Sequence, residues 1–101
     1  MPAIYKVEIT PSAERDLEEI WDYIANDNPG NATAFILQIE GQIYSLEQSP
    51  ERCPLISENQ ILGTSYRHLI CGSYRTIFRI YSETVYILRI IHAARLLEEL
   101  L

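Results

Sequence analysis

The chain has 101 residues, of which 48% are hydrophobic and 22% charged, and its formal net charge is −6. These values are typical of one folded domain, residues 1–101, and exclude a disordered chain. The acidic balance excludes a general nucleic-acid-binding protein, which carries a basic footprint, and no apolar run reaches the roughly 20 residues of a membrane-spanning helix.

The first segment alternates apolar and charged side chains over residues 4–9, which predicts a half-buried strand. Thr10 and Pro11 then predict a helix N-terminus. A stripe at helical spacing predicts about four turns, with Trp21 in the core; its members are Ala13, Leu17, Ile20, Trp21 and Ile24. The acids along this helix, Asp16 among them, suggest either a metal or acid–base site or a solvated face, and the lack of histidine favours the face.

A dense turn signal at residues 26–30 precedes a second helix. Its apolar stripe runs from Ala32 to Leu46, and Gly41 inside it suggests close packing on the first helix, since glycine costs helix stability. The short turn predicts an antiparallel helix hairpin. Ser49-Pro50 ends it, and irregular chain is expected to about Thr64.

The period changes to two from Tyr66, which predicts an antiparallel meander of three strands over residues 66–70, 74–81 and 85–91. Strict alternation places Arg89 and Ile91 on the same face as Ile87, and one apolar face is expected to cover the hairpin. Residues 93–101 predict a short helix, with its apolar side formed by Leu96, Leu97, Leu100 and Leu101. The order describes a two-layer α+β domain with an N-terminal strand, a helix hairpin, a meander and a short C-terminal helix.

Charge is distributed unevenly along the chain. Residues 1–60 carry eleven acids against three basic residues, a net of −8, whereas residues 61–101 carry five arginines against three acids, a net of +2. Clustered arginines suggest a recognition surface, because each guanidinium is a rigid fork of donors that stays charged. The alternative is that they pair with acids of the first half.

Cysteine use is sparse, and the N-terminus has no basic region followed by an apolar region. Cys53 and Cys71 predict free thiols in a reducing compartment, and they lack the spacing and histidine partners of a zinc site. We therefore expect a cytoplasmic protein without a secretory signal, a metal or a cofactor.

The order of elements and several short motifs resemble the RelE/ParE superfamily of toxins from type II toxin–antitoxin modules. The resemblance spans essentially the whole chain, and the order and spacing of its motifs carry it. They are Tyr5-x-Val7 before Thr10-Pro-Ser-Ala13, Asp16-Leu17, Ile20-x-x-Tyr23-Ile24-Ala25, Asn28-Pro29, Ser49-Pro50, Tyr66-Arg67-x-Leu69, Tyr74-Arg75 and Ile87-Leu-Arg-Ile-Ile-His92-Ala-Ala-Arg95.

Members of this superfamily have two activities. RelE-like members are ribosome-dependent mRNA endoribonucleases, and on that resemblance the catalytic residues would be Arg67, Arg75, His92 and Arg95. The tyrosine that such enzymes carry shortly after the last arginine is missing, since Arg95 is followed by Leu-Leu-Glu-Glu-Leu-Leu. ParE-like members inhibit DNA gyrase and need no catalytic residues, and the Ile-x-x-His-x-x-Arg ending resembles theirs.

The ParE-like interpretation is favoured, with DNA gyrase and a cognate antitoxin as partners, no membrane, and DNA contacted only through the antitoxin complex. The antitoxin is expected to neutralise the toxin with an acidic, amphipathic segment that folds on binding. The alternatives are the endoribonuclease, acting on ribosome and mRNA, and a non-toxic relic that only binds antitoxin.

The predicted residues of the target or antitoxin surface are Arg67, Tyr74, Arg75, Arg79, His92 and Arg95. For three of them a structural role competes. Arg75 is also suited to pair with an acid such as Glu58 or a helix carboxylate. His92 is also suited to cap the last strand or bond the backbone, and Arg95 to pair with Glu98 or Glu99.

Overall fold

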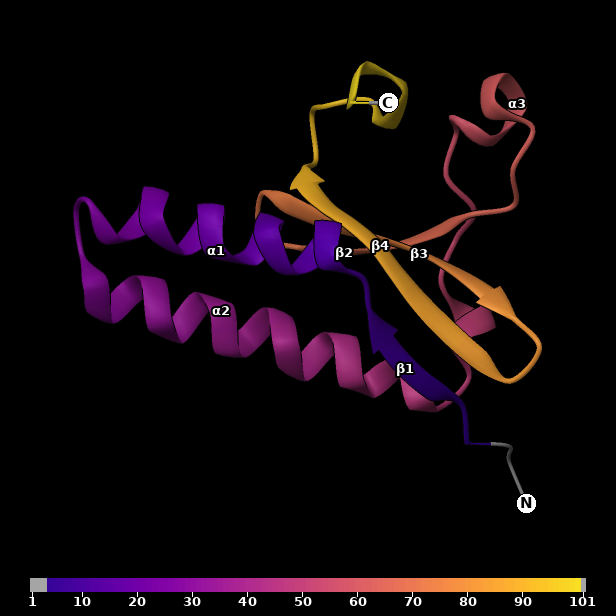
Figure 1. Cartoon of the computed structure of the whole chain (residues 1–101), viewed down its shortest axis with the longest axis horizontal. Helices are drawn as coiled ribbons and strands as arrows, with labels where there is room; N and C mark the ends of the chain where they lie inside the picture. The colour runs from indigo at the N-terminus through magenta and orange to yellow at the C-terminus, as the bar shows by residue number, and fades with distance from the viewer. Residues whose placement is uncertain (1–3, 101) are drawn as a thin grey trace.

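The computed structural model describes residues 4–100. In these residues, two long helices form a layer that covers one face of a four-stranded sheet (Figure 1). The predicted α+β order is confirmed. The elements are β1 (Lys6–Ile9), α1 (Pro11–Ala25), α2 (Pro29–Tyr44), α3 (Asn59–Leu62), β2 (Arg67–Cys71), β3 (Tyr74–Tyr81) and β4 (Thr84–His92). A 3-10 turn, Leu97–Leu100, stands where the C-terminal helix was expected, while Leu101 and the side chain of Leu100 lie outside the described part.

Both long helices begin at a capping side chain followed by proline. The Thr10 hydroxyl oxygen accepts a hydrogen bond from the Ala13 amide at 3.3 Å and donates to the Ile87 carbonyl at 2.7 Å. Asn28 caps α2 in the same way, accepting from the Asn31 amide at 3.0 Å. Thr10 thus fixes the start of α1 against β4.

The sheet has the order β1-β4-β3-β2, with β1 parallel to β4 and the other pairs antiparallel. The meander was predicted, but the place of β1 beside β4 was not. Because β1 pairs with β4 only as far as Ile87, the rest of that edge of β4 is left for α1 to cover.

A β-bulge in β4 corrects the predicted faces of this strand. Ile77 pairs with Arg89 and Phe78 with Ile87, so that Leu88 is the extra residue. A bulge reverses the alternation beyond it. Ile90 therefore shares the helix-covered face with Ile87, and Ile91 lies on the opposite face, contrary to the strict alternation assumed from sequence.

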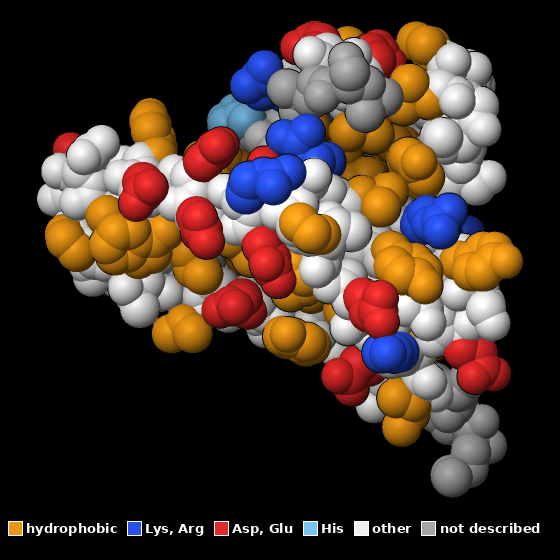
Figure 2. Space-filling view, in the orientation of Figure 1, with side chains coloured by type: hydrophobic (Ala, Val, Ile, Leu, Met, Phe, Trp, Pro, Cys, Tyr) orange, Lys and Arg blue, Asp and Glu red, His pale blue; other side chains and the backbone are white. Residues whose placement is uncertain are grey.

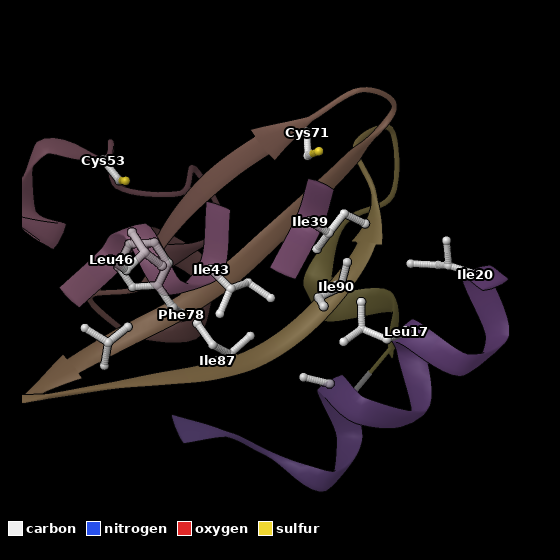
Figure 3. Packing of buried hydrophobic residues seen from close by; sticks show 12 residues of the cluster. Leu17, Ile20, Ile39, Ile43, Leu46, Cys53, Cys71, Phe78, Ile87 and Ile90 are labelled. Carbon is white, nitrogen blue, oxygen red and sulfur yellow. The ribbon is translucent and has the colours of Figure 1, made fainter. Parts of the chain in front are cut away.

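The buried residues form two clusters on the two faces of the sheet. The larger one lies between the helix pair and the sheet, and ten of its residues are labelled in Figure 3, among them Leu17, Ile39, Phe78 and Ile87. The smaller one contains Ile56, Ile77, Ile91 and Leu97. Through it, the loop before β2 and the C-terminal segment cover half of the opposite face.

Two predictions about the hairpin are wrong. Trp21 is 37% exposed, and its indole Nε1 donates to the Thr33 hydroxyl at 3.2 Å. The turn between α1 and α2 projects beyond the sheet (Figure 1), so this end of α1 has only α2 to pack on. Gly41 does not mark close packing either, because a Cβ built there meets nothing within 4 Å.

The length and hydrophobicity of the helices show whether any of them could cross a membrane. Within residues 4–100, no helix combines the length and apolar character that crossing a bilayer would require.

Candidate functional site

A depression of about 340 Å³ lies where α1 meets the start of β3 and the end of β4. It brings together Tyr74, His92 and Arg95, three of the six residues predicted from sequence. From α1, Glu19 and Tyr23 form the opposite wall. The strand ends and the segment after β4 therefore present aromatic and basic groups beside an acidic helix face, and Figure 2 shows acidic side chains gathered along α1.

Tyr74 and His92 are direct partners in the β3–β4 register. Their rings stand edge to face, with centroids 5.6 Å apart and an interplanar angle of 70°, and Phe35 of α2 lies 5.7 Å from Tyr74 on another side. Burial raises the pKa of Tyr74, so the phenol is a donor at neutral pH. Tyr74 forms the aromatic floor of the depression, and the exposed ring of His92 stands at its rim.

His92 is exposed, and its Nδ1 accepts a hydrogen bond from the Ala94 amide at 3.2 Å. This bond requires an unprotonated Nδ1, so the neutral ring carries its proton on Nε2. The contact with the backbone is one of the structural roles left open from sequence, and it leaves Nε2 free to meet a partner.

Arg75 is only 5% exposed and pairs with Glu58, which is 2% exposed. The ion pair is bidentate, with one Nη–Oε distance of 3.2 Å. Its Nη1 also lies 3.3 Å from the Nδ1 of His68, and both burial and the nearby guanidinium lower the pKa of that histidine. The structural alternative for Arg75, a pair with Glu58, is thus what the structure contains.

The same ion pair anchors the C-terminal segment. Arg75 Nη2 donates to the Arg95 carbonyl at 2.7 Å, and the Leu97 amide donates to Glu58 Oε2 at 2.9 Å. The Arg75 hydrogen bond and the Leu97 amide bond favour ionised Glu58, and its pKa falls to about 2. The Arg75 side chain thus holds the backbone of Arg95, while the Arg95 side chain is exposed. Among residues 4–100, no ion pair joins the Arg95 side chain to Glu98 or Glu99.

The other two predicted residues lie elsewhere. Arg67, at the start of the edge strand β2, donates to the carbonyls of Glu51 at 3.1 Å and Cys53 at 2.6 Å and so ties down the preceding loop. Arg79 is exposed on the face of the sheet that the helices leave open. The six residues therefore do not form one site.

Asp16 corrects the prediction that the acids of α1 form a solvated face. It is 7% exposed and accepts from Arg89 at 2.7 and 3.0 Å and from the Ile90 amide at 2.9 Å. Its carboxylate accepts the backbone N–H of Ile90, on the edge of β4 that extends beyond its pairing with β1. The hydrogen bond from Arg89 to Asp16 raises the pKa of Arg89. This pair lines the depression and neutralises part of its wall.

Metal chemistry has no ready site in the described part of the chain. Within residues 4–100, no three His, Cys, Asp or Glu side chains are placed to hold one ion. The two cysteines are free, as predicted, and both are buried.

Comparison with known proteins adds a family and two solved structures. A family model, described as the ParE toxin of the type II toxin–antitoxin system parDE, matches residues 7–97. A structure from the chromosomal ParDE system of P. aeruginosa is similar, with 24% identity and a TM-score of 0.72, over 89% of this chain and 97% of that one. The RelBE2 toxin–antitoxin complex from Mycobacterium tuberculosis gives 29% identity and a TM-score of 0.60, over 92% and 95%. No curated protein sequence matches the chain.

Proposed function

The chain belongs to the ParE toxin family of type II toxin–antitoxin systems, and on this premise we propose that it inhibits DNA gyrase and is neutralised by a cognate antitoxin. The two similar structures come from toxin–antitoxin systems of both ParDE and RelBE type. Fold similarity therefore supports an antitoxin partner but is shared by both activities, so the choice of target must come from the site.

The burial of Arg75 is the observation that favours gyrase over RNA. An endoribonuclease of the RelE type would use this arginine to stabilise the negative charge that develops on the scissile phosphate. Here both Nη atoms donate to Glu58, and one of them also to the Arg95 carbonyl. The Nε has no hydrogen-bond partner within residues 4–100, but it is buried and Arg75 does not line the depression. A guanidinium in this arrangement offers no donor to a phosphate in the depression.

The exposed members of the site fit contact with a protein. His92 and Arg95 are exposed at the rim, and Tyr74 forms the floor with its phenol protonated at neutral pH. Aromatic and arginine side chains of this kind are enriched at protein interfaces. Glu19 in the opposite wall of the depression and the net charge of −6 both oppose the approach of RNA phosphates.

Purified protein tests the proposal in a gyrase supercoiling assay run beside a ribosome-dependent mRNA cleavage assay. We expect inhibition of supercoiling with trapped DNA breaks and intact mRNA. Arg95→Ala should raise the inhibitory concentration about tenfold or more, as expected for an exposed interface arginine. Arg15→Ala is the matched control, since Arg15 is exposed and bonds only Ser12.

Ribosome-dependent mRNA cleavage that disappears in His92→Ala would overturn the proposal in favour of the endoribonuclease. Expression without any growth defect, and without activity in either assay, would instead indicate a relic that only binds antitoxin.

A further inference from the structure

The face of the sheet opposite the helices is only half covered. The C-terminal segment and the loop before β2 cover Ile77 and Ile91 through Leu97 and Ile56. The uncovered half carries Tyr81, Arg79 and Tyr86, which we call the Arg79 patch. The first two share this face as alternate residues of β3, and Tyr86 is the direct cross-strand partner of Arg79.

Two tyrosine rings hold the guanidinium of Arg79. Its Cζ lies 5.4 Å from the ring centroid of Tyr81 and 5.2 Å from that of Tyr86, and Tyr81 is 65% exposed. Cation–π contacts of this kind orient an arginine without using its N–H donors. The patch therefore presents to solvent a guanidinium group whose orientation is fixed by two tyrosine rings.

The donors of Arg79 have no acceptor within residues 4–100. No hydrogen bond or ion pair there involves its side chain, whereas the neighbouring Glu8 on β1 is taken by Lys6 at 3.0 Å. A free guanidinium fork matches a carboxylate, which it binds in a bidentate manner.

A concavity beside the patch gives a bound segment room to continue. It measures about 280 Å³ and lies between Arg79 and Ile80 on one side and residues 63–66 on the other. Its lining contains no acid, unlike the depression beside His92, which includes Glu19. Although the chain carries a net charge of −6, no carboxylate of this lining repels an acidic segment, and the nearby Glu8 is paired with Lys6.

From this geometry we propose that the Arg79 patch is a docking site for the acidic segment of the antitoxin, with one carboxylate of that segment bonded to Arg79 and neighbouring side chains packed on Tyr81 and Tyr86. The inference rests on the proposed function for the identity of its partner. It places the antitoxin contact on the face of the sheet opposite the helix hairpin, away from the depression proposed to meet gyrase.

The test measures binding of the purified antitoxin encoded beside the gene by calorimetry. Loss of a charge-assisted bidentate contact should weaken binding by about 100-fold in Arg79→Glu and by about tenfold in Arg79→Lys, which keeps the charge but not the fork. Arg15→Glu makes the same charge change on the helix layer and should stay within about twofold of wild type. Circular dichroism confirms that each variant is folded.

Charge reversal identifies the carboxylate. One of the acidic residues of the antitoxin, changed to lysine, should restore binding to Arg79→Glu while weakening binding to the wild type. Equal affinities of Arg79→Glu and Arg15→Glu, or self-association of the toxin that Arg79→Glu abolishes, would overturn the docking site.

The outcomes separate this inference from the proposed function. Wild-type binding that is insensitive to Arg79 removes only the docking site, and the antitoxin pairing stands. No binding of the wild type would remove the antitoxin pairing and the docking site together. The gyrase assay reports the target in either case, because it contains no antitoxin.

Discussion

At the scale of single residues, Glu58 shows how one buried carboxylate organises a surface that it does not itself reach. It binds Arg75 from β3 and the Leu97 amide from the C-terminal segment. Breaking a buried ion pair leaves a charge without compensation, at a cost of about 3–5 kcal/mol. The exposed Arg95 therefore depends on a residue distant from it in sequence.

Glu58→Gln should lower the free energy of unfolding by about 3 kcal/mol at pH 7, because Arg75 keeps its buried charge and loses its counter-ion. The folded-state pKa of Glu58 is about 2, below its ordinary value of 4.5, so this contribution is present above about pH 4.5 and is lost as the pH falls toward 2. Urea titrations at a series of pH values measure the difference between the two proteins.

We expect that difference to shrink steadily below pH 4.5 and to approach zero near pH 2. Glu18→Gln, at an exposed position of α1, is the control and should change stability by less than about 0.5 kcal/mol. A Glu58→Gln difference that is the same at pH 7 and pH 3 would contradict the assigned ion pair.

Asp16 shows what the sequence interpretation missed although a signal was present. It lies three residues after Ala13 and four before Ile20, which places it on the apolar stripe of α1 and not beside it. Arg89 is likewise a lone charge within the apolar run of β4. A charge in each of two buried patterns is a reason to expect that the two meet, and they do at 2.7 Å.

At the scale of elements, capping and periodicity predicted the helices and the meander, and both are confirmed. The site was less predictable, because its geometry depends on non-local features. The bulge at Leu88 reverses the faces of the last part of β4, and no glycine or proline marks it in the sequence. The position of β1 beside β4 is equally a matter of tertiary contact, since local pattern does not select a strand's partner.

Replacing either of two glycines by alanine should change the free energy of unfolding, but in opposite directions. Gly41 is exposed inside α2, and the space that an alanine methyl group would occupy there is open, so Gly41→Ala should raise the free energy of unfolding by about 1 kcal/mol. Gly63 ends α3 at φ +68°, where an L side chain is strained, so Gly63→Ala should lower it by about 1 kcal/mol. Thermal denaturation of both variants tests this. A more stable Gly63→Ala protein would contradict the assigned end of α3, and a less stable Gly41→Ala protein would contradict the open space at that position.

At the scale of the whole molecule, the two buried clusters have different roles in the fold. The larger cluster joins both helices to the sheet, and the smaller one attaches the C-terminal segment and the loop before β2 to the opposite face. Arg95, which is proposed to face the target, lies two residues before Leu97 of the smaller cluster, and Arg79 lies two residues after Ile77 of the same cluster. The larger cluster thus supplies most of the stability of the domain, whereas the smaller cluster holds the segments beside the proposed binding surfaces in place.

Leu97→Ala and Ile87→Ala should separate these two parts. Both side chains are buried, but Ile87 belongs to the larger cluster and Leu97 to the smaller one. Ile87→Ala should reduce global stability by about 2–5 kcal/mol. Leu97→Ala should release the C-terminal segment by local opening, seen as faster amide exchange after β4 while the amides of α1 and α2 stay protected.

The release of this segment should also affect gyrase inhibition, because Arg95 is then no longer held in place. Inhibition by the folded Leu97→Ala protein should fall about as far as in Arg95→Ala. Full inhibition by Leu97→Ala would show that the target is contacted without this segment.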